Sequence, residues 1–217
     1  MLEALLPPGV LCAESWSDDE SAPLFPQEQA QIGNAVESRL REFATARSLA
    51  RRALGGLGFP QAAIPRGAKG EPLWPSGAIG SITHCTGYRA AAVARRIQIS
   101  MLGIDAEIDD TLPPEVAASV LVAEEMSWIE KAPALHPWDR LLFSAKESVY
   151  KAWFPLTHRW LDFSQIAVAI DPPAGAFQVH PVGMLPEDCA RILRRLCGRF
   201  LRHGGIILTA VFLPQEI

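Results

Sequence analysis

The stretch FSAKESVYKAW, residues Phe143–Trp153, carries the clearest structural signal in the sequence. Apolar residues recur in and around it at helical spacing, which predicts a helix over Trp138–Phe154 that Pro155 ends. Residues four apart lie on one face of a helix, so Glu147 and Lys151 are expected side by side. Spacing alone favours an ordinary surface ion pair, although two of the four lysines of the chain fall in this helix.

A second stretch, GIDAE at Gly103–Glu107, ends an apolar run in two carboxylates. Residues two apart on a strand point to the same side, so Asp105 and Glu107 would share one face. Like charges this close repel each other unless a cation lies between them, and oxygen ligands suit Mg²⁺. The same pattern also fits a strand that runs into solvent, and spacing leaves both interpretations open.

The remaining periodicities place helix, loop and strands in the first half of the chain, then helices and strands in the second. Besides the helix described above, the expected helices are Ile32–Leu54, a short one from Pro113, and Ala123–Lys131, and the expected strands are Gly9–Ala13, Tyr88–Ala94, Met101–Ile104, Ile166–Ile170, Ala176–His180, Gly198–Arg202 and Ile206–Leu213. This order predicts an α+β fold of two similar halves, 1–101 and 102–217.

The composition narrows the classes of function. The 217 residues are 49% hydrophobic and 20% charged, which indicates a globular chain. The formal net charge of −4 argues against a general nucleic-acid binder. No CxxC pair occurs among the four cysteines, so we expect reduced thiols and no zinc ribbon. With no signal peptide and no apolar run of about 18–20 residues, we expect a soluble cytoplasmic protein that does not enter a membrane.

Phosphate-binding side chains also appear in the first half. Two hydroxyls and an imidazole follow Gly80 in the segment SITH, at 81–84, and could cradle a phosphate. The alternative is a strand end with a satisfied histidine. Arginines on the expected helix over Ile32–Leu54 fit either a solvated face or an anion site.

These motifs together resemble one known family. RGAKGEPLWPSGAIGSITHCTGYRAAAVA at 66–94, GIDAE at 103–107 and FSAKESVYKAWFPLT at 143–157 are similar to 4′-phosphopantetheinyl transferases of the surfactin-synthetase type (Sfp-type). Within that type, the chain resembles the branch of enterobactin synthetase component D, and its actinobacterial members above all. The likeness runs from about Arg39 to Trp160 and implies a pseudo-dimer of two α+β halves with the active site at their interface.

The resemblance implies a reaction and its participants. Coenzyme A would give 4′-phosphopantetheine to a serine of an apo carrier protein, leaving adenosine 3′,5′-bisphosphate. The partners would be acyl or peptidyl carrier domains of fatty-acid, polyketide or nonribosomal-peptide synthases. The cofactor would be Mg²⁺, with Mn²⁺ as a substitute. A monomer is expected, since the pseudo-dimer supplies its own second half.

Site residues follow from the matching motif positions. Glu147 is implied as the general base and Lys151 as the group that stabilises phosphoryl charge. The implied metal ligands are Asp105, Glu107 and Glu147, with the backbone carbonyl of Ala106. The residues implied to bind coenzyme A are Arg39, Arg47, Arg66, Gly67, Ala68, Lys69, Thr83, His84, Asp105, Lys146, Glu147 and Lys151.

Two rival functions share these features. A non-catalytic module could bind coenzyme A or a carrier, but the complete motifs argue against it. A Mg²⁺-dependent pyrophosphohydrolase would use the same carboxylates and anion without a protein acceptor.

Overall fold

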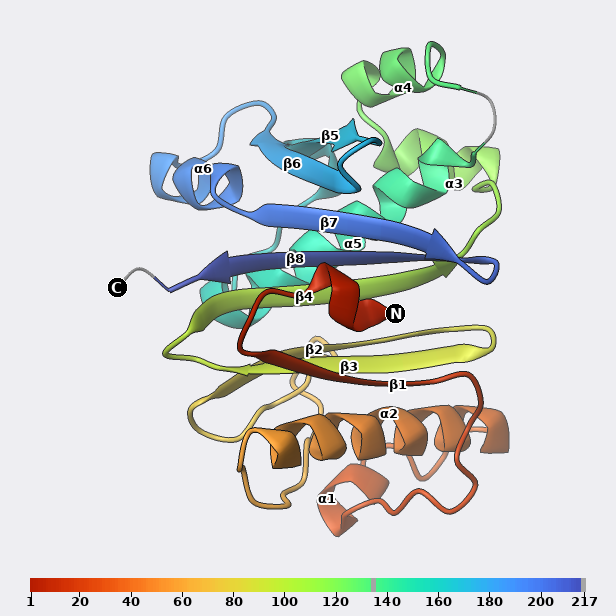
Figure 1. Cartoon of the computed structure of the whole chain (residues 1–217), viewed down its shortest axis with the longest axis vertical. Coiled ribbons are helices and arrows are strands. Elements are labelled where there is room, and N and C mark those ends of the chain that lie inside the picture. The colour runs from red at the N-terminus through yellow and green to blue at the C-terminus, as the bar shows by residue number, and fades with distance from the viewer. Residues whose placement is uncertain (134–135, 216–217) are drawn as a thin grey trace.

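The computed structural model describes residues 1–133 and 136–215 and contains two antiparallel sheets, stacked one above the other in Figure 1. The first sheet has the order β1-β3-β2 and is built from β1 (Val10–Ser15), β2 (Ala78–Cys85) and β3 (Tyr88–Arg95). The second has the order β4-β8-β7-β6-β5 and is built from β4 (Ile99–Ile108), β5 (Ile166–Asp171), β6 (Ala176–Pro181), β7 (Cys197–His203) and β8 (Ile206–Pro214).

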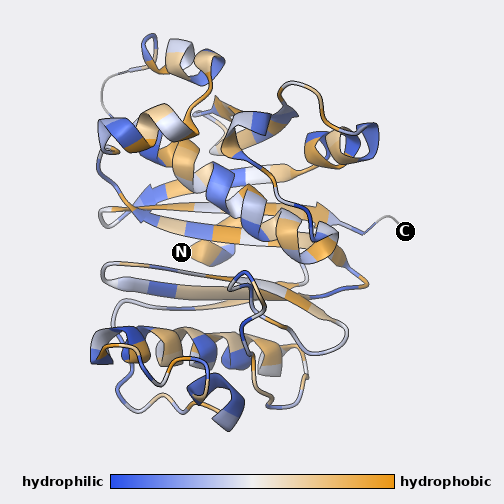
Figure 2. Cartoon of the chain, turned by 180° about the vertical axis from the view of Figure 1, so that it is seen from behind, coloured by the Kyte–Doolittle hydropathy of each residue, from blue (hydrophilic) through white to orange (hydrophobic). Residues whose placement is uncertain are grey.

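One long helix packs against each sheet. Helix α2 (Glu37–Gly56) packs against the three-stranded sheet and α5 (Trp138–Thr157) against the five-stranded one (Figures 1 and 2). The shorter helices are α1 (Pro26–Gln29), α3 (Pro114–Val120), α4 (Ala123–Ile129) and α6 (Glu187–Arg194), with 3₁₀ turns at Leu2–Leu5 and Phe163–Gln165. The α+β fold predicted from the sequence is confirmed, and both halves follow one plan of a helix on an antiparallel sheet.

The two halves meet where β2 lies beside β4. Hydroxyls of β2 take the place of a backbone ladder there: Ser81 Oγ accepts from the Ile104 N–H at 3.1 Å, and Thr83 Oγ1 accepts from the Ala106 N–H at 3.0 Å. Between the sheets lies an apolar cluster that includes Leu102. The segment that looked like a phosphate cradle therefore also joins the halves.

Gly103 allows α5 to press closely against β4. A Cβ at this position would lie 1.9 Å from the Ser148 carbonyl oxygen and 2.7 Å from the Ala152 nitrogen. Any side chain here would push the helix away from the strand. The missing side chain therefore keeps the acidic and basic residues of α5 within reach of the carboxylates of β4.

Some predicted boundaries were wrong. Pro155 does not end α5, which runs to Thr157 before His158 turns left-handed at φ 52°. The last turn is held by the Thr157 hydroxyl, which donates to the Trp153 carbonyl at 3.0 Å. Helix α2 begins at Glu37 rather than at residue 32, and α6 was not expected.

The predicted strands all occur, each within a few residues of its expected ends. The expected division of the chain at residues 101 and 102 falls inside β4, and where the halves separate as folding units stays a prediction. Within the described ranges, no helix combines the length and the apolar character needed to cross a membrane.

Candidate active site

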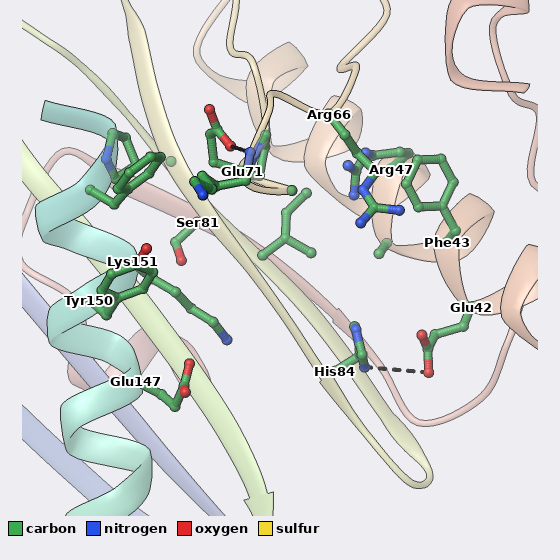
Figure 3. Close-up of a pocket in the computed structure, with 18 of the residues that line it drawn as sticks. Glu42, Phe43, Arg47, Arg66, Glu71, Ser81, His84, Glu147, Tyr150 and Lys151 are labelled. Carbon is green, nitrogen blue, oxygen red and sulfur yellow. Dashed lines mark hydrogen bonds and ion pairs between the residues drawn. The ribbon is translucent and has the colours of Figure 1, made fainter. Parts of the chain in front are cut away.

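A cavity of about 250 Å³ opens where the two halves meet, and Figure 3 shows side chains converging on it from α2, β2 and α5. Its charged lining consists of five cations and three carboxylates: Arg39, Arg47, Arg66, Lys69 and Lys151, with Glu42, Glu71 and Glu147. Aromatic side chains line both sides of the cavity, with Phe43 on α2 and with Tyr150 and Phe154 on α5. An excess of cations in a concave, partly apolar site suits an anionic ligand with an organic body.

The carboxylate of Asp105 lies at the base of this region and is buried, with 4% of its surface exposed. Its Oδ1 accepts from Lys151 Nζ at 2.6 Å and from the Thr83 hydroxyl at 3.1 Å. Its Oδ2 accepts from the Ser144 hydroxyl at 2.8 Å. A strand residue and a helix residue from separate motifs, Asp105 and Lys151, are thus brought together as an ion pair.

Glu107 lies two residues further along β4 and pairs with a different cation. Its Oε2 accepts from Arg140 Nη1 of α5 at 2.9 Å. Burial raises the pKa of Glu107, and the charge of Asp105 raises that pKa further, while Arg140 opposes both. The two carboxylates are therefore close enough to repel each other.

Glu147 faces the cavity from α5, as Figure 3 shows, and accepts no hydrogen bond from any described residue. Burial raises the pKa of Glu147; Lys151 opposes this, and the charges of Asp105 and Glu107 add to it. A carboxylate with a raised pKa and no bonded partner has the properties of a general base.

These carboxylates fit a hard divalent cation by donor type and by charge. Asp105 and Glu107 each raise the pKa of Glu147, so a cation among the three would relieve their repulsion. Among the described residues, no group of three such side chains lies close enough together to hold a metal, and in this arrangement Lys151 pairs with Asp105 and Arg140 with Glu107. The carbonyl of Ala106 lies on the same strand edge as its N–H, which faces β2.

His84 and Arg39 form the other end of the site. Arg39 Nη1 lies 3.0 Å from His84 Nε2, and because arginine only donates, Nε2 must be the accepting nitrogen. The other ring nitrogen, Nδ1, then carries the proton and lies 3.4 Å from Glu42 (Figure 3). Partial burial lowers the pKa of His84 to about 4, and the charges of Arg39, Lys151, Arg89 and Arg47 add to this effect.

The loop that carries Arg66 and Lys69 is fixed from two sides. The side-chain amide of Gln31 accepts from the Arg66 N–H at 2.6 Å and donates to its carbonyl at 2.9 Å. Glu71 Oε2 accepts from the Lys69 N–H at 2.9 Å, and a Cβ on Gly67 would lie 2.1 Å from the Glu71 carboxylate.

Not every predicted residue lines the cavity. The predicted residues that line it are Arg39, Arg47, Arg66, Lys69, His84, Glu147 and Lys151. Gly67 and Ala68 belong to the loop turn, and Thr83 and Asp105 lie behind the lining. Arg47 is buried, donates to the Ile64 carbonyl at 2.9 Å and packs its guanidinium 4.1 Å from the Phe43 ring centre. Its partners therefore hold it beside the cavity.

Lys146 is the clearest departure from the expected site. Its side chain is fully buried and lies 2.7 Å from Glu125, and it donates to the carbonyls of Val120 at 2.8 Å and Phe163 at 3.1 Å. The structure therefore places Lys146 among α3, α4 and the turn after α5, away from the cavity lining. Lys146 as a ligand of phosphate stays a prediction from the resemblance, and its amine is used in this arrangement to pair with Glu125.

Several residues of the site were missed from the sequence. The cavity lining includes Glu42, Glu71 and Tyr150, and Gln31 fixes the loop of Arg66. Behind the lining, Arg140 bonds Glu107, Ser144 bonds Asp105, and Thr209 contacts Ser144. No local motif marks Gln31, Arg140, Ser144 and Thr209, because their partners are distant in the sequence. Glu42 alone had a signal, because it lies three residues after Arg39 on a helix face.

Known proteins resemble the chain along most of its length. Residues 27–94 match the family model of the 4′-phosphopantetheinyl transferase N-terminal domain, and residues 101–196 match that of the 4′-phosphopantetheinyl transferase superfamily. 4′-phosphopantetheinyl transferase Svp of Streptomyces mobaraensis is 45% identical over 97% of this chain and 88% of its own length. 4′-phosphopantetheinyl transferase PptT of Mycobacterium tuberculosis is 42% identical over 93% and 91%. Enterobactin synthase component D of Salmonella typhi is 34% identical over 57% and 52%.

Proposed function

The chain belongs to the 4′-phosphopantetheinyl transferase superfamily, as its motifs indicate, and we propose that it moves 4′-phosphopantetheine from coenzyme A to a serine of an apo carrier protein in a Mg²⁺-dependent reaction. The products are the holo carrier and adenosine 3′,5′-bisphosphate. One observation carries the proposal: a cavity between the halves combines a cationic wall with the carboxylate of Glu147 and the amine of Lys151.

The cationic wall binds the phosphates of coenzyme A. Arg39, Arg47, Arg66 and Lys69 approach the cavity from α2 and from the loop, and His84 approaches from β2. Gly67 and Ala68 shape the turn that presents the loop cations. The aromatic side chains of Phe43, Tyr150 and Phe154 accommodate an apolar part of the same ligand.

Asp105, Glu107 and Glu147 would hold Mg²⁺, and Mn²⁺ could replace it. The backbone carbonyl of Ala106, on the edge of β4 that faces β2, would be a further ligand. The ion supplies charge neutralisation for the pyrophosphate of coenzyme A. Lys151, which is paired with Asp105 Oδ1, can then turn its amine toward the transferred phosphoryl group.

Glu147 takes the proton of the carrier serine, directly or through a water molecule. The serine oxygen forms a bond to the β-phosphorus of coenzyme A, and the bond from that phosphorus to the oxygen of adenosine 3′,5′-bisphosphate breaks. Lys151 stabilises the charge that collects on the phosphoryl group and the leaving phosphate. The position of Glu147 supports its role, because its carboxylate faces the cavity and accepts no hydrogen bond from any described residue.

The partners are acyl or peptidyl carrier domains of fatty-acid, polyketide or nonribosomal-peptide synthases, and no nucleic acid takes part. We propose a cytoplasmic monomer in which residues 1–101 and 102–217 form the two halves. Both halves line the cavity, so one chain supplies a whole site.

A product analysis tests the proposal against its rivals. The chain is incubated with coenzyme A and Mg²⁺, with and without a panel of apo carrier proteins, and nucleotide products are separated by chromatography. Adenosine 3′,5′-bisphosphate that appears only with a carrier supports transfer. Carrier-independent cleavage of coenzyme A would favour the hydrolase. Binding without any product would favour the non-catalytic module.

A further inference from the structure

We infer that Ser144 and Thr209 are positioning residues that hold the carboxylate of Asp105 in its working orientation. The inference rests on the proposed function, because it takes Asp105 as a metal ligand. Neither residue is part of the cavity lining, and both are fully buried. They come from α5 and from β8, the strand that pairs with β4.

The three side chains form a connected series. The Ser144 hydroxyl lies 2.8 Å from Asp105 Oδ2 and 3.0 Å from the Thr209 hydroxyl. The Thr209 hydroxyl also donates to the Ser144 carbonyl oxygen at 2.9 Å. Thr209 lies directly opposite Asp105 in the pairing of β8 with β4, so the sheet register fixes its place.

The order of the protons follows from the acceptors. A carboxylate is the strongest acceptor present, so the single proton of Ser144 goes to Asp105. The single proton of Thr209 then lies between the carbonyl oxygen and the hydroxyl oxygen of Ser144. Ser144 therefore donates to Oδ2 of Asp105, and Oδ1 is left for Thr83 and Lys151. Thr209 acts on Asp105 only through Ser144, which it holds by the carbonyl and hydroxyl oxygens.

The alternative is that both hydroxyls are merely satisfied polar groups of the core. Thr209 is the only polar residue of β8 between Ile206 and Leu213, and a valine would fill the same volume. When both partners of a buried hydrogen bond are replaced by apolar groups of the same shape, the stability of the protein changes little. The Thr209 hydroxyl contacts Ser144, and Ser144 donates to Asp105, the proposed metal ligand, which gives Thr209 a role beyond packing.

The test uses Mn²⁺ uptake with coenzyme A present and no carrier, so that no turnover occurs. The variants are Thr209→Val, Ser144→Ala and the conservative Thr209→Ser. Ser148→Ala is the matched control, because Ser148 is equally buried on α5 but donates only to the Ala145 carbonyl, at 2.8 Å. Free Mn²⁺ is measured by electron paramagnetic resonance, and thermal melting reports folding.

We expect Thr209→Val and Ser144→Ala to bind Mn²⁺ about 10–100-fold more weakly, with Thr209→Ser close to the wild-type chain and Ser148→Ala unchanged. If Thr209→Val does not fold, Ser144→Ala decides alone. Folded variants that both bind Mn²⁺ like the wild type would overturn the inference and leave the proposed function standing. Unchanged uptake in Asp105→Ala, or no uptake in the wild type, would instead overturn the metal assignment and the inference with it.

Discussion

Replacing Lys146 with methionine separates a structural role for this lysine from a role in binding phosphate. The amine lies 2.7 Å from Glu125 at a site with no solvent exposure, and Glu125 also accepts from the N–H groups of Val122 and Val168, at 2.9 and 2.8 Å. Methionine keeps the volume of the lysine side chain but leaves the Glu125 carboxylate buried without its cation. Breaking a buried pair in this way costs about 3–5 kcal/mol.

The expected result is a large loss of stability with little change in ligand binding. For a chain of this length, each kcal/mol lowers the melting temperature by about 2–4 °C, so Lys146→Met should melt roughly 6–20 °C lower. Glu125→Gln combined with Lys146→Met should recover part of this loss, because no unpaired charge remains. The KM for coenzyme A, measured well below the transition, should stay near its wild-type value.

The assay is thermal unfolding by circular dichroism together with steady-state kinetics at a fixed carrier concentration. Lys151→Met is the contrasting variant, since Lys151 lines the cavity. A Lys146→Met chain that melts like the wild type while its KM for coenzyme A rises about tenfold or more would refute the structural role.

Three further predictions follow from the site. Gly103→Ala should destabilise the chain by about 1–3 kcal/mol or more and also lower kcat, because the new Cβ would push α5 away from β4. A melting temperature and a kcat within error of the wild-type values would contradict this. Gln31→Ala should raise the KM for coenzyme A more than it lowers kcat, because the loop of Arg66 loses both contacts with Gln31, and an unchanged KM would argue against the clamp. The pKa of His84 falls from 6.5 to about 4 on folding, so the unfolded chain binds more protons between pH 4 and 6.5. Stability therefore falls as the pH drops through this range. His84→Gln should flatten that part of the profile of stability against pH, and an equally steep profile would count against the prediction.

The placement of the proposed catalytic residues could be predicted from the sequence because its geometry is local. Glu147 and Lys151 share a helix face through a spacing of four residues, and Asp105 and Glu107 share a strand face through a spacing of two. These spacings depend only on the local backbone geometry of a helix or a strand and not on contacts with the rest of the chain. The helix and the strand were therefore expected, and α5 and β4 contain all four residues.

The failures involve contacts distant in the sequence. Lys146 was expected at the cavity because it adjoins Glu147, but its partner Glu125 lies on α4, and one position along a helix turns a side chain to another face. Thr209 could not be linked to Asp105 before the pairing of β4 with β8 was known. The end of α5 was misplaced because the helix continues for two residues past Pro155, where the Thr157 hydroxyl donates to the Trp153 carbonyl.

The most direct test of the central claim is the intact mass of an apo carrier protein after incubation with this chain, coenzyme A and Mg²⁺. The account predicts a gain of one phosphopantetheine on the carrier, and loss of that gain when a chelator removes the divalent ion. Glu147→Gln should fold like the wild-type chain and transfer at least about a hundredfold more slowly, because the base is gone. A carrier that gains no mass with the wild-type chain, or gains it equally fast with Glu147→Gln, would contradict the account.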